Sequence, residues 1–215
     1  MAASNQAVER INGTLKRVPV LPLYLVALVP GVWTFWQALH GGLGADPMRV
    51  LEHELGIWAL RFMLATLAVT PLMRWGGVRV LRFRRMLGLT VFFYALAHLA
   101  VYLVLDQQFY WGAIARDILK RPYIMFGMAA FVMLLPMAAT SNNASVKRLG
   151  AAAWRNLHRL AYPAGLFMVL HYLWLVKSWT TEPLIYAAIM AVLLALRLVP
   201  LIPGRGTRRV QGARA

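Results

Sequence analysis

Six apolar stretches of about 20 residues recur along the 215-residue chain, and each is long enough to cross the ~30 Å hydrocarbon core of a bilayer as a helix. They run over residues 19–39, 53–73, 85–105, 122–140, 157–176 and 183–199. Backbone polar groups in lipid must be satisfied within the protein, which favours helices for such stretches. The sequence therefore predicts an all-α, polytopic membrane protein, a bundle of six transmembrane helices.

We expect three segments along the chain. Residues 1–17 form a cytoplasmic N-terminal segment, residues 18–200 the membrane domain, and residues 201–215 a basic tail expected to be disordered. The first apolar stretch is too long for the apolar part of a cleavable signal peptide, and prolines interrupt it. It is therefore interpreted as a retained helix.

The positive charge of the chain predicts its orientation. The formal net charge is +16, and Lys and Arg accumulate in the cytoplasmic loops of membrane proteins. With the N-terminus inside, seventeen Lys and Arg residues fall on inner segments and five on outer ones. The sequence predicts N-in and C-in topology, with basic residues contacting membrane lipid and no nucleic acid partner.

The chain contains no cysteine. This excludes covalently attached c-type haem, cysteine-ligated iron–sulfur clusters, thiol redox chemistry and disulfides. The sequence also shows no Ser/His/Asp arrangement, no HExxH motif and no phosphate-binding glycine loop. No residues in it therefore support a hydrolase function.

His98 and His171 each lie within an apolar stretch, 13 residues beyond Arg85 and His158 respectively. Both stretches begin on the inner side, so both histidines are expected about 20 Å into the membrane at 1.5 Å per residue. Ionisable residues at such depth usually mark function. The matched depth predicts two axial ligands of one haem iron. The alternatives are interhelical hydrogen bonds and a small proton or ion transporter.

His158 is expected near the inner surface. It is interpreted as a ligand of a second haem, or as a contact of a flavin, a quinone or a haem propionate. His40 and His53 have ordinary explanations at the membrane interface and at a solvated helix start.

Arginines supply the candidate anion contacts. Arg61 lies within the second apolar stretch, where it must reach water or meet an anion, such as a haem propionate. Further arginines crowd the inner surface, where arginine forks suit a phosphate-bearing cofactor, although lipid anchoring also accounts for them. They are Arg74, Arg79, Arg82, Arg84, Arg85 and Arg155.

Three segments, RRMLGLTVFFYALAHLAVYLVLD, KRPYIMFGMAAFVMLLPMAATS and WRNLHRLAYPAGLFMVLHYLWLVK, resemble a family of haem-binding membrane subunits of bacterial methionine sulfoxide reductase systems. That family belongs to the ferric-reductase-like transmembrane proteins. The resemblance covers nearly all of residues 15–200. It implies a six-helix haem-binding bundle in the bacterial inner membrane, with haem b and FMN as cofactors.

The resemblance also implies partners. Electrons would come from the quinone pool or a cytosolic flavin reductase. They would pass to a periplasmic MsrP-like molybdopterin subunit, in a heterodimer, which repairs oxidised periplasmic proteins. The haem histidines of the family carry over onto His98, His158 and His171. Arg85 stands where eukaryotic relatives have a fourth histidine, and their NADPH and flavin domains are missing here. A cofactor-free anchoring subunit is the remaining alternative.

Overall fold

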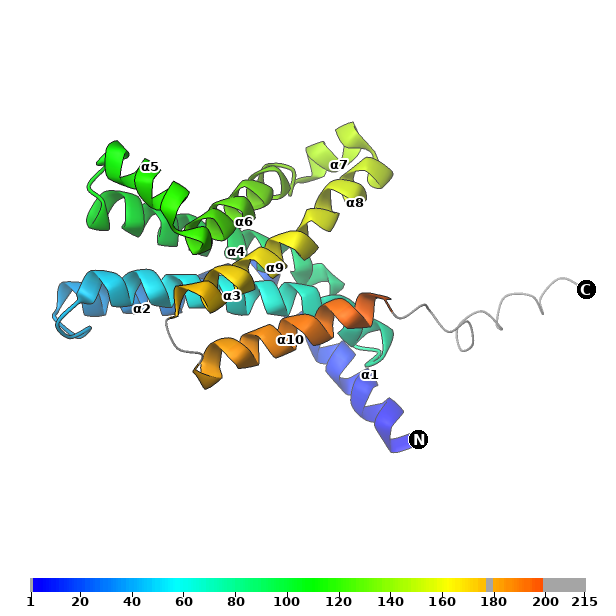
Figure 1. Ribbon diagram of the computed structural model, residues 1–215. Helices are drawn as coiled ribbons and strands as arrows, with labels where there is room; N and C mark the ends of the chain where they lie inside the picture. Colours follow the sequence, from blue (N-terminus) through cyan, green and yellow to red (C-terminus); the bar gives the residue numbers. More distant parts are fainter. Residues whose placement is uncertain (1, 177–179, 199–215) are drawn as a thin grey trace, which may run out of the picture.

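The computed structural model describes residues 2–176 and 180–198, and within them the chain is helical and contains no strand (Figure 1). The α-helices are α1 (Ala2–Arg17), α2 (Val20–Leu39), α3 (Pro47–Arg74), α4 (Arg84–Ala100), α5 (Trp111–Lys120), α6 (Pro122–Ala139), α7 (Asn143–Leu149), α8 (Ala151–Leu157), α9 (Ala161–Leu175) and α10 (Thr181–Leu198). Short 3₁₀ turns, η1 (Leu81–Phe83) and η3 (His158–Leu160), precede α4 and α9, and a π-helical segment, η2 (Val101–Asp106), continues α4. The predicted all-α class is confirmed.

Each of the six predicted stretches coincides with a helix of the bundle. Within the described residues, four segments are long and apolar enough to cross a membrane, namely Val20–Leu39, Pro47–Arg74, Leu81–Asp106 and Pro122–Ala139. This supports a protein that crosses the membrane several times. The stretches predicted over 157–176 and 183–199 contain α9 and α10, which are not among these four, so the count of six spans stays a prediction.

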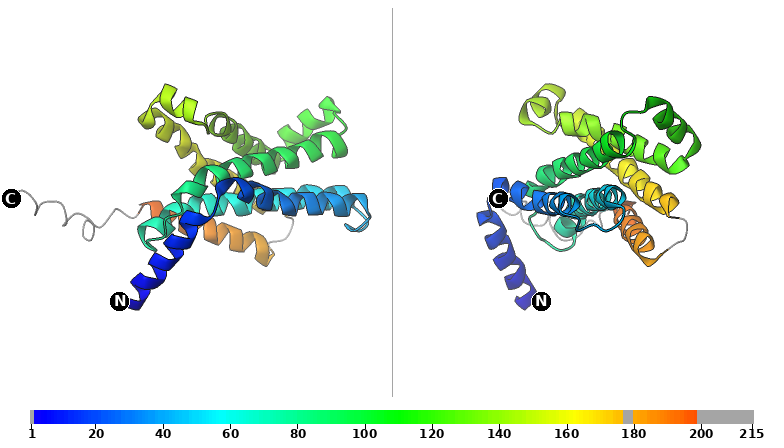
Figure 2. Two further views of the ribbon diagram at one scale, coloured as in Figure 1. Left: turned by 180° about the vertical axis from the view of Figure 1, so that it is seen from behind. Right: turned by 90° about the vertical axis from the view of Figure 1, so that its left-hand side faces the viewer.

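The bundle is built from two closely packed helix pairs. α3 packs along α4 and α6 packs along α9, while α10 contacts both α3 and α9. Figure 2, in its end-on view, shows these helices gathered around α3 and α9. Buried side chains of α3, α9 and α10 form the centre of the core, among them Leu60, Met63, Leu67, Ala164 and Met190.

The two ends of the bundle carry different segments. α1, α7, α8 and the last turns of α10 lie at one end, and the α2–α3 connection and α5 lie at the other (Figures 1 and 2). The described chain thus begins and ends on the same side. We call the first end the inner end and the second the outer end, following the predicted topology. The predicted basic tail, 201–215, lies outside the described residues.

The N-terminal segment is a helix docked on the inner end. The Asn12 side-chain amide donates to the Gly77 carbonyl (3.0 Å), and its oxygen accepts from the Arg79 N–H (2.7 Å). Arg82 donates to the carbonyls of Leu15 and Lys16 at the end of α1. Cationic groups stabilise a helix C-terminus in this way, because the last carbonyls have no partner within the helix.

α3 begins six residues before the predicted stretch at 53–73. The Asp46 carboxylate accepts from the Arg49 N–H at 3.2 Å, and Pro47 occupies the first helical position, where a missing N–H costs nothing. The apolar pattern missed this start because charged residues interrupt the first two turns. Glu52 and His53 therefore lie in the second turn of α3, where both line the cavity described below. His53, which the sequence places at a solvated helix start, is half-buried there.

Tyr94 joins α4 to the proline-containing helix α2. Its buried hydroxyl accepts from the Gly31 N–H (2.9 Å) and donates to the Ala27 carbonyl (2.7 Å). An ideal helix would pair those two backbone groups directly. Pro30 lies beside them within α2, and side-chain groups inserted in this way accompany bends in helices.

Candidate functional site

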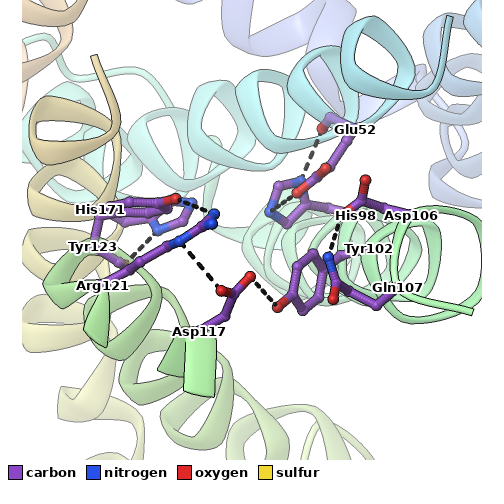
Figure 3. A network of polar contacts seen from close by, with 9 residues as sticks. All are labelled: Glu52, His98, Tyr102, Asp106, Gln107, Asp117, Arg121, Tyr123 and His171. Carbon is purple, nitrogen blue, oxygen red and sulfur yellow. Dashed lines mark hydrogen bonds and ion pairs between the residues drawn. The ribbon is translucent and has the colours of Figure 1, made fainter. Parts of the chain in front are cut away.

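His98 on α4 and His171 on α9 come together near the outer end of the bundle. Their ring centres are 5.9 Å apart and their planes differ by 82°. Figure 3 shows His171 beside Tyr123 and Arg121, and His98 beside Glu52. The two residues that the sequence places at matching depth are therefore neighbours in space.

Hydrogen bonds to backbone carbonyls fix both imidazoles. His98 Nδ1 lies 2.8 Å from the Glu52 carbonyl oxygen on α3, and His171 Nδ1 lies 2.6 Å from the Tyr123 carbonyl oxygen on α6. A carbonyl oxygen can only accept, so Nδ1 carries the proton of each neutral ring and Nε2 keeps its lone pair. This is the arrangement of a metal-ligating histidine, whose second nitrogen donates to an outer partner.

A cavity of about 840 Å³ lies between the two histidines and the helices that carry them. Its deep part is lined by apolar side chains, including Ala59, Leu60, Ala95, Phe131, Leu134 and Met168. Its outer part is lined by polar and charged side chains, including Asp46, Arg49, Glu52, His53, Asp106 and Arg121. The cavity suits a ligand with an apolar body and an anionic edge.

A chain of polar contacts crosses the outer mouth of this cavity (Figure 3). The Tyr102 hydroxyl reaches Asp117 of α5 at 3.5 Å, and Asp117 pairs with Arg121 at 3.3 Å. Arg121 donates to the Tyr123 hydroxyl at 3.1 Å. This bond raises the pKa of the Arg121 guanidinium, with a smaller contribution from Asp117, so Arg121 keeps its positive charge beside the Asp117 carboxylate. The network links residues next to His98 with residues next to His171.

His158 stands apart from this pair, at the start of η3. Its ring stacks on Trp154 with ring centres 3.7 Å apart. Nδ1 bonds the Trp154 carbonyl one turn earlier at 3.0 Å, and Nε2 lies 3.5 Å from the Ser141 hydroxyl. His158 does not line the cavity of His98 and His171. Its assignment to a second cofactor stays a prediction.

Arg61 lies on α3 away from the cavity lining. Its Nε donates to the Tyr186 hydroxyl of α10 at 2.8 Å, and the guanidinium sits over the Trp58 ring at 4.7 Å. The Glu182 carboxylate lies 3.9 Å from Arg61 Nη2, and the exposed fractions of the Arg61 and Glu182 side chains are 39% and 52%. These contacts give Arg61 polar partners within the bundle.

The inner arginines divide into two groups. Arg79 and Arg82 bind α1, as described above. Arg74 and Arg84 lie close enough to Arg197 of α10 to interact with it electrostatically, and Arg84 likewise to His158. Arg197 donates to the Tyr162 hydroxyl and the Leu67 carbonyl. Arg85 lies in the first turn of α4 and Arg155 in the last turn of α8, near the same inner end.

Two features of the outer site are not predicted by the sequence. Arg49 and Arg121 are expected only to carry positive charge in outer loops, and helix α5, which supplies Asp117, is not expected. The signals were the Asp46-Pro47 helix start, which makes Arg49 helical, and the amphipathic pattern of residues 111–120, whose buried side is Ile114.

Comparison with known proteins adds two findings. Residues 55–169 match the family model described as "Ferric reductase like transmembrane component". Over 177 residues the chain is 51% identical to the "Protein-methionine-sulfoxide reductase heme-binding subunit MsrQ" of Brucella anthropi, covering 82% of this chain and 80% of the relative. The proteins of the same name from Brucella ovis and Brucella canis are each 51% identical over 176 residues, with the same coverage.

Proposed function

Because the chain belongs to the MsrQ family of ferric-reductase-like transmembrane proteins, we propose that it is the haem b electron-transfer subunit of a methionine sulfoxide reductase system. The observation that carries the proposal is the pair of histidines that line one cavity with Nδ1 bound to a backbone carbonyl, which leaves the Nε2 lone pair of each ring for a metal. The Glu52 carboxylate lies 4.0 Å from His98 Nε2. The names of the Brucella relatives describe them as heme-binding subunits, which supports haem as the cofactor.

The geometry of the histidine pair fits a single metal ion. Two imidazole nitrogens that each lie about 2 Å from one metal put their ring centres roughly 6 Å apart, and the rings of His98 and His171 are 5.9 Å apart. A bare ion would need further protein ligands, whereas a porphyrin already supplies four. The donor set is therefore that of a bis-histidine haem, which transfers single electrons.

The cavity fits the same group. Its volume of about 840 Å³ lies within the ~300–1,000 Å³ range of sites for small ligands and cofactors. The apolar side chains of its deep part would surround the ring system. Arg49 and Arg121 at the mouth would bind the propionates through charge-assisted hydrogen bonds. Arg61, for which the sequence allows this role, does not line the cavity and donates to the Tyr186 hydroxyl instead.

The inner arginines support FMN as a second cofactor. Within the described part of the chain, Arg197 Nε is buried without a hydrogen-bond partner, and Arg74 and Arg84 add positive charge beside it. Arginine forks of this kind suit a phosphate. We expect Arg84→Gln to lose FMN while Arg148→Gln, on the exposed surface of α7, retains it. Equal FMN content in the two variants would remove this site.

The direction of electron flow follows from the predicted topology. Electrons would enter at the inner end from the quinone pool or a cytosolic flavin reductase. They would leave at the outer end, in the bacterial inner membrane, toward a periplasmic MsrP-like molybdopterin subunit. Acidic side chains of the outer end, such as Asp46 and Asp106 at the cavity and Glu54 in the first turns of α3, offer docking points for that partner.

Electron transfer between purified components tests the function. Reduction of a sulfoxide consumes two electrons and two protons and releases water. Chemically reduced protein should therefore be reoxidised by methionine sulfoxide only when an MsrP-like enzyme is present, and the His171→Ala variant should not support turnover. Reoxidation by methionine sulfoxide without the partner, or none with it, would contradict the assignment as an electron-transfer subunit.

A further inference from the structure

Two glycines occupy equivalent positions beside the two candidate ligands. Gly56 follows Glu52 by four residues on α3, and Gly127 follows Tyr123 by four residues on α6. Residues four apart lie on the same helix face. Each helix thus presents to a neighbouring histidine first the carbonyl that accepts from Nδ1 and then, one turn later, a glycine.

Both histidine rings lie against these glycines. A Cβ added at Gly127 would be 2.8 Å from His171 Nδ1 and 3.1 Å from Cε1. A Cβ added at Gly56 would be 3.1 Å from His98 Nδ1 and 3.3 Å from Cε1. At both positions the three nearest atoms all belong to the histidine ring. A methyl group would therefore occupy the space of the imidazole.

Neither glycine is needed for its backbone conformation, because neither has a positive φ and both lie inside α-helices, where glycine is less favourable than alanine. Small residues also allow helices to approach one another. Gly165 of α9 has this helix-packing role, because a Cβ added there would meet the side chains of Met190 on α10 and Leu67 on α3. Gly56 and Gly127 instead face imidazole atoms.

We propose that Gly56 and Gly127 are positioning residues that let His98 and His171 lie flat against α3 and α6, so that each ring holds its carbonyl bond and aims Nε2 at the shared cavity. The inference rests on the proposed function, because it concerns how the haem ligands are oriented. Each half-site is thus a three-part unit of carbonyl, glycine and histidine, shared between α3 and α4 in one case and between α6 and α9 in the other.

An alanine at either position should move the ring away from its helix and lengthen the Nδ1–H···O bond. That bond raises the basicity of the ligand and so stabilises the oxidised metal. Weakening it should raise the reduction potential of the haem. Loss of such an outer partner typically lowers metal affinity by roughly ten- to a hundredfold. Gly127→Ala should have the larger effect, since its contact is the shorter one.

Two glycines on the ligand helices provide matched controls. Gly88 of α4 has no atom within 4 Å of an added Cβ, so Gly88→Ala introduces the same methyl group into open space. Gly165→Ala introduces it into a tight contact that involves no histidine. The four variants separate a change in ligand orientation from a change in helix packing.

The test is the haem content, reduction potential and electron paramagnetic resonance spectrum of the four purified variants, with thermal stability measured alongside. We expect Gly127→Ala and Gly56→Ala to shift the potential upward and to alter the ferric spectrum. Gly165→Ala should lower stability and leave the spectrum unchanged, and Gly88→Ala should change neither. If Gly127→Ala does not fold, the potential and ferric spectrum of Gly56→Ala test the proposal.

Spectra and potentials of Gly56→Ala and Gly127→Ala that match those of Gly88→Ala would overturn the positioning role while His98 and His171 stand as ligands. Full haem content in His98→Ala or His171→Ala would instead overturn the ligand assignment itself. The two failures are therefore distinguishable in one set of preparations.

Discussion

The outer and inner ends of the bundle each hold histidine, and in the described part of the chain their surroundings differ. At the outer end, His98 and His171 donate from Nδ1 to carbonyls of other helices, and both rings line one cavity. At the inner end, His158 donates to a carbonyl one turn away on its own segment and stacks on Trp154. A buried histidine becomes a candidate ligand when a neighbouring helix fixes its tautomer and a cavity receives its second nitrogen.

The largest effect we predict concerns which end of the bundle faces the periplasm. A reporter active only in the periplasm should be active when inserted near Gln107, at the outer end, and silent when fused after Arg209. The reason is the excess of basic residues on the inner segments. The reverse pattern would reverse the direction of electron flow while leaving the histidine pair in place.

The second prediction compares the histidines directly. His98→Ala and His171→Ala should each lose most of the haem, by more than about tenfold, because one strong-field ligand is removed. His158→Ala should keep the outer haem and alter electron entry, a second haem or the flavin content. Haem quantified per purified protein measures this, with His40→Ala as a surface control. Equal loss of haem in all three variants would contradict the proposed difference between the histidines of the two ends.

Much of the outer site could be predicted from the sequence because helix rise is regular. Equal spacing from the inner surface put His98 and His171 at one depth, and the structure brings them together. Their carbonyl and glycine partners could not be predicted, because hydrogen bonds between helices depend on which helices pack against each other. The helical position of Arg49 was missed for a related reason, since charged residues in the first turns of α3 interrupt the apolar pattern.

The all-α class and the family were also within reach of the sequence. The comparisons confirm the family, and the all-α class follows from the recurring apolar stretches, while the number of six spans stays a prediction. Residue spacing does not predict where Pro163 lies within its helix. The predicted stretch at 157–176 contains it, and the structure begins α9 at Ala161 after the turn η3. Pro163 therefore lies in the first turn, where its missing N–H breaks no helical bond.

The third prediction tests the charged mouth of the outer cavity. Arg121→Gln should weaken haem binding by about tenfold, the equivalent of one charge-assisted hydrogen bond. Arg116→Gln is the matched control, because Arg116 lies on the exposed face of α5 and bonds the Gly112 carbonyl of its own helix. Haem titration of the apoprotein measures both. Identical affinities would assign the propionate contact elsewhere.

The smallest predicted effect lies away from both ends. Tyr94→Phe removes the hydroxyl that bridges Gly31 and Ala27, at a cost of about 1 kcal/mol. Thermal unfolding should occur at a lower temperature while haem content and spectrum are retained, since Tyr94 contacts α2 and does not line the histidine cavity. A haem spectrum that changes with this substitution would show that α2 also shapes the site.

The central claim is that one haem iron sits between His98 and His171, and the most direct measurement is an iron anomalous difference map from crystals of the haem-loaded protein. The account predicts a peak between the Nε2 atoms of these two residues, with porphyrin density filling the outer cavity. A porphyrin bound at His158 with the outer cavity empty, or a peak ligated by only one of the pair, would contradict it.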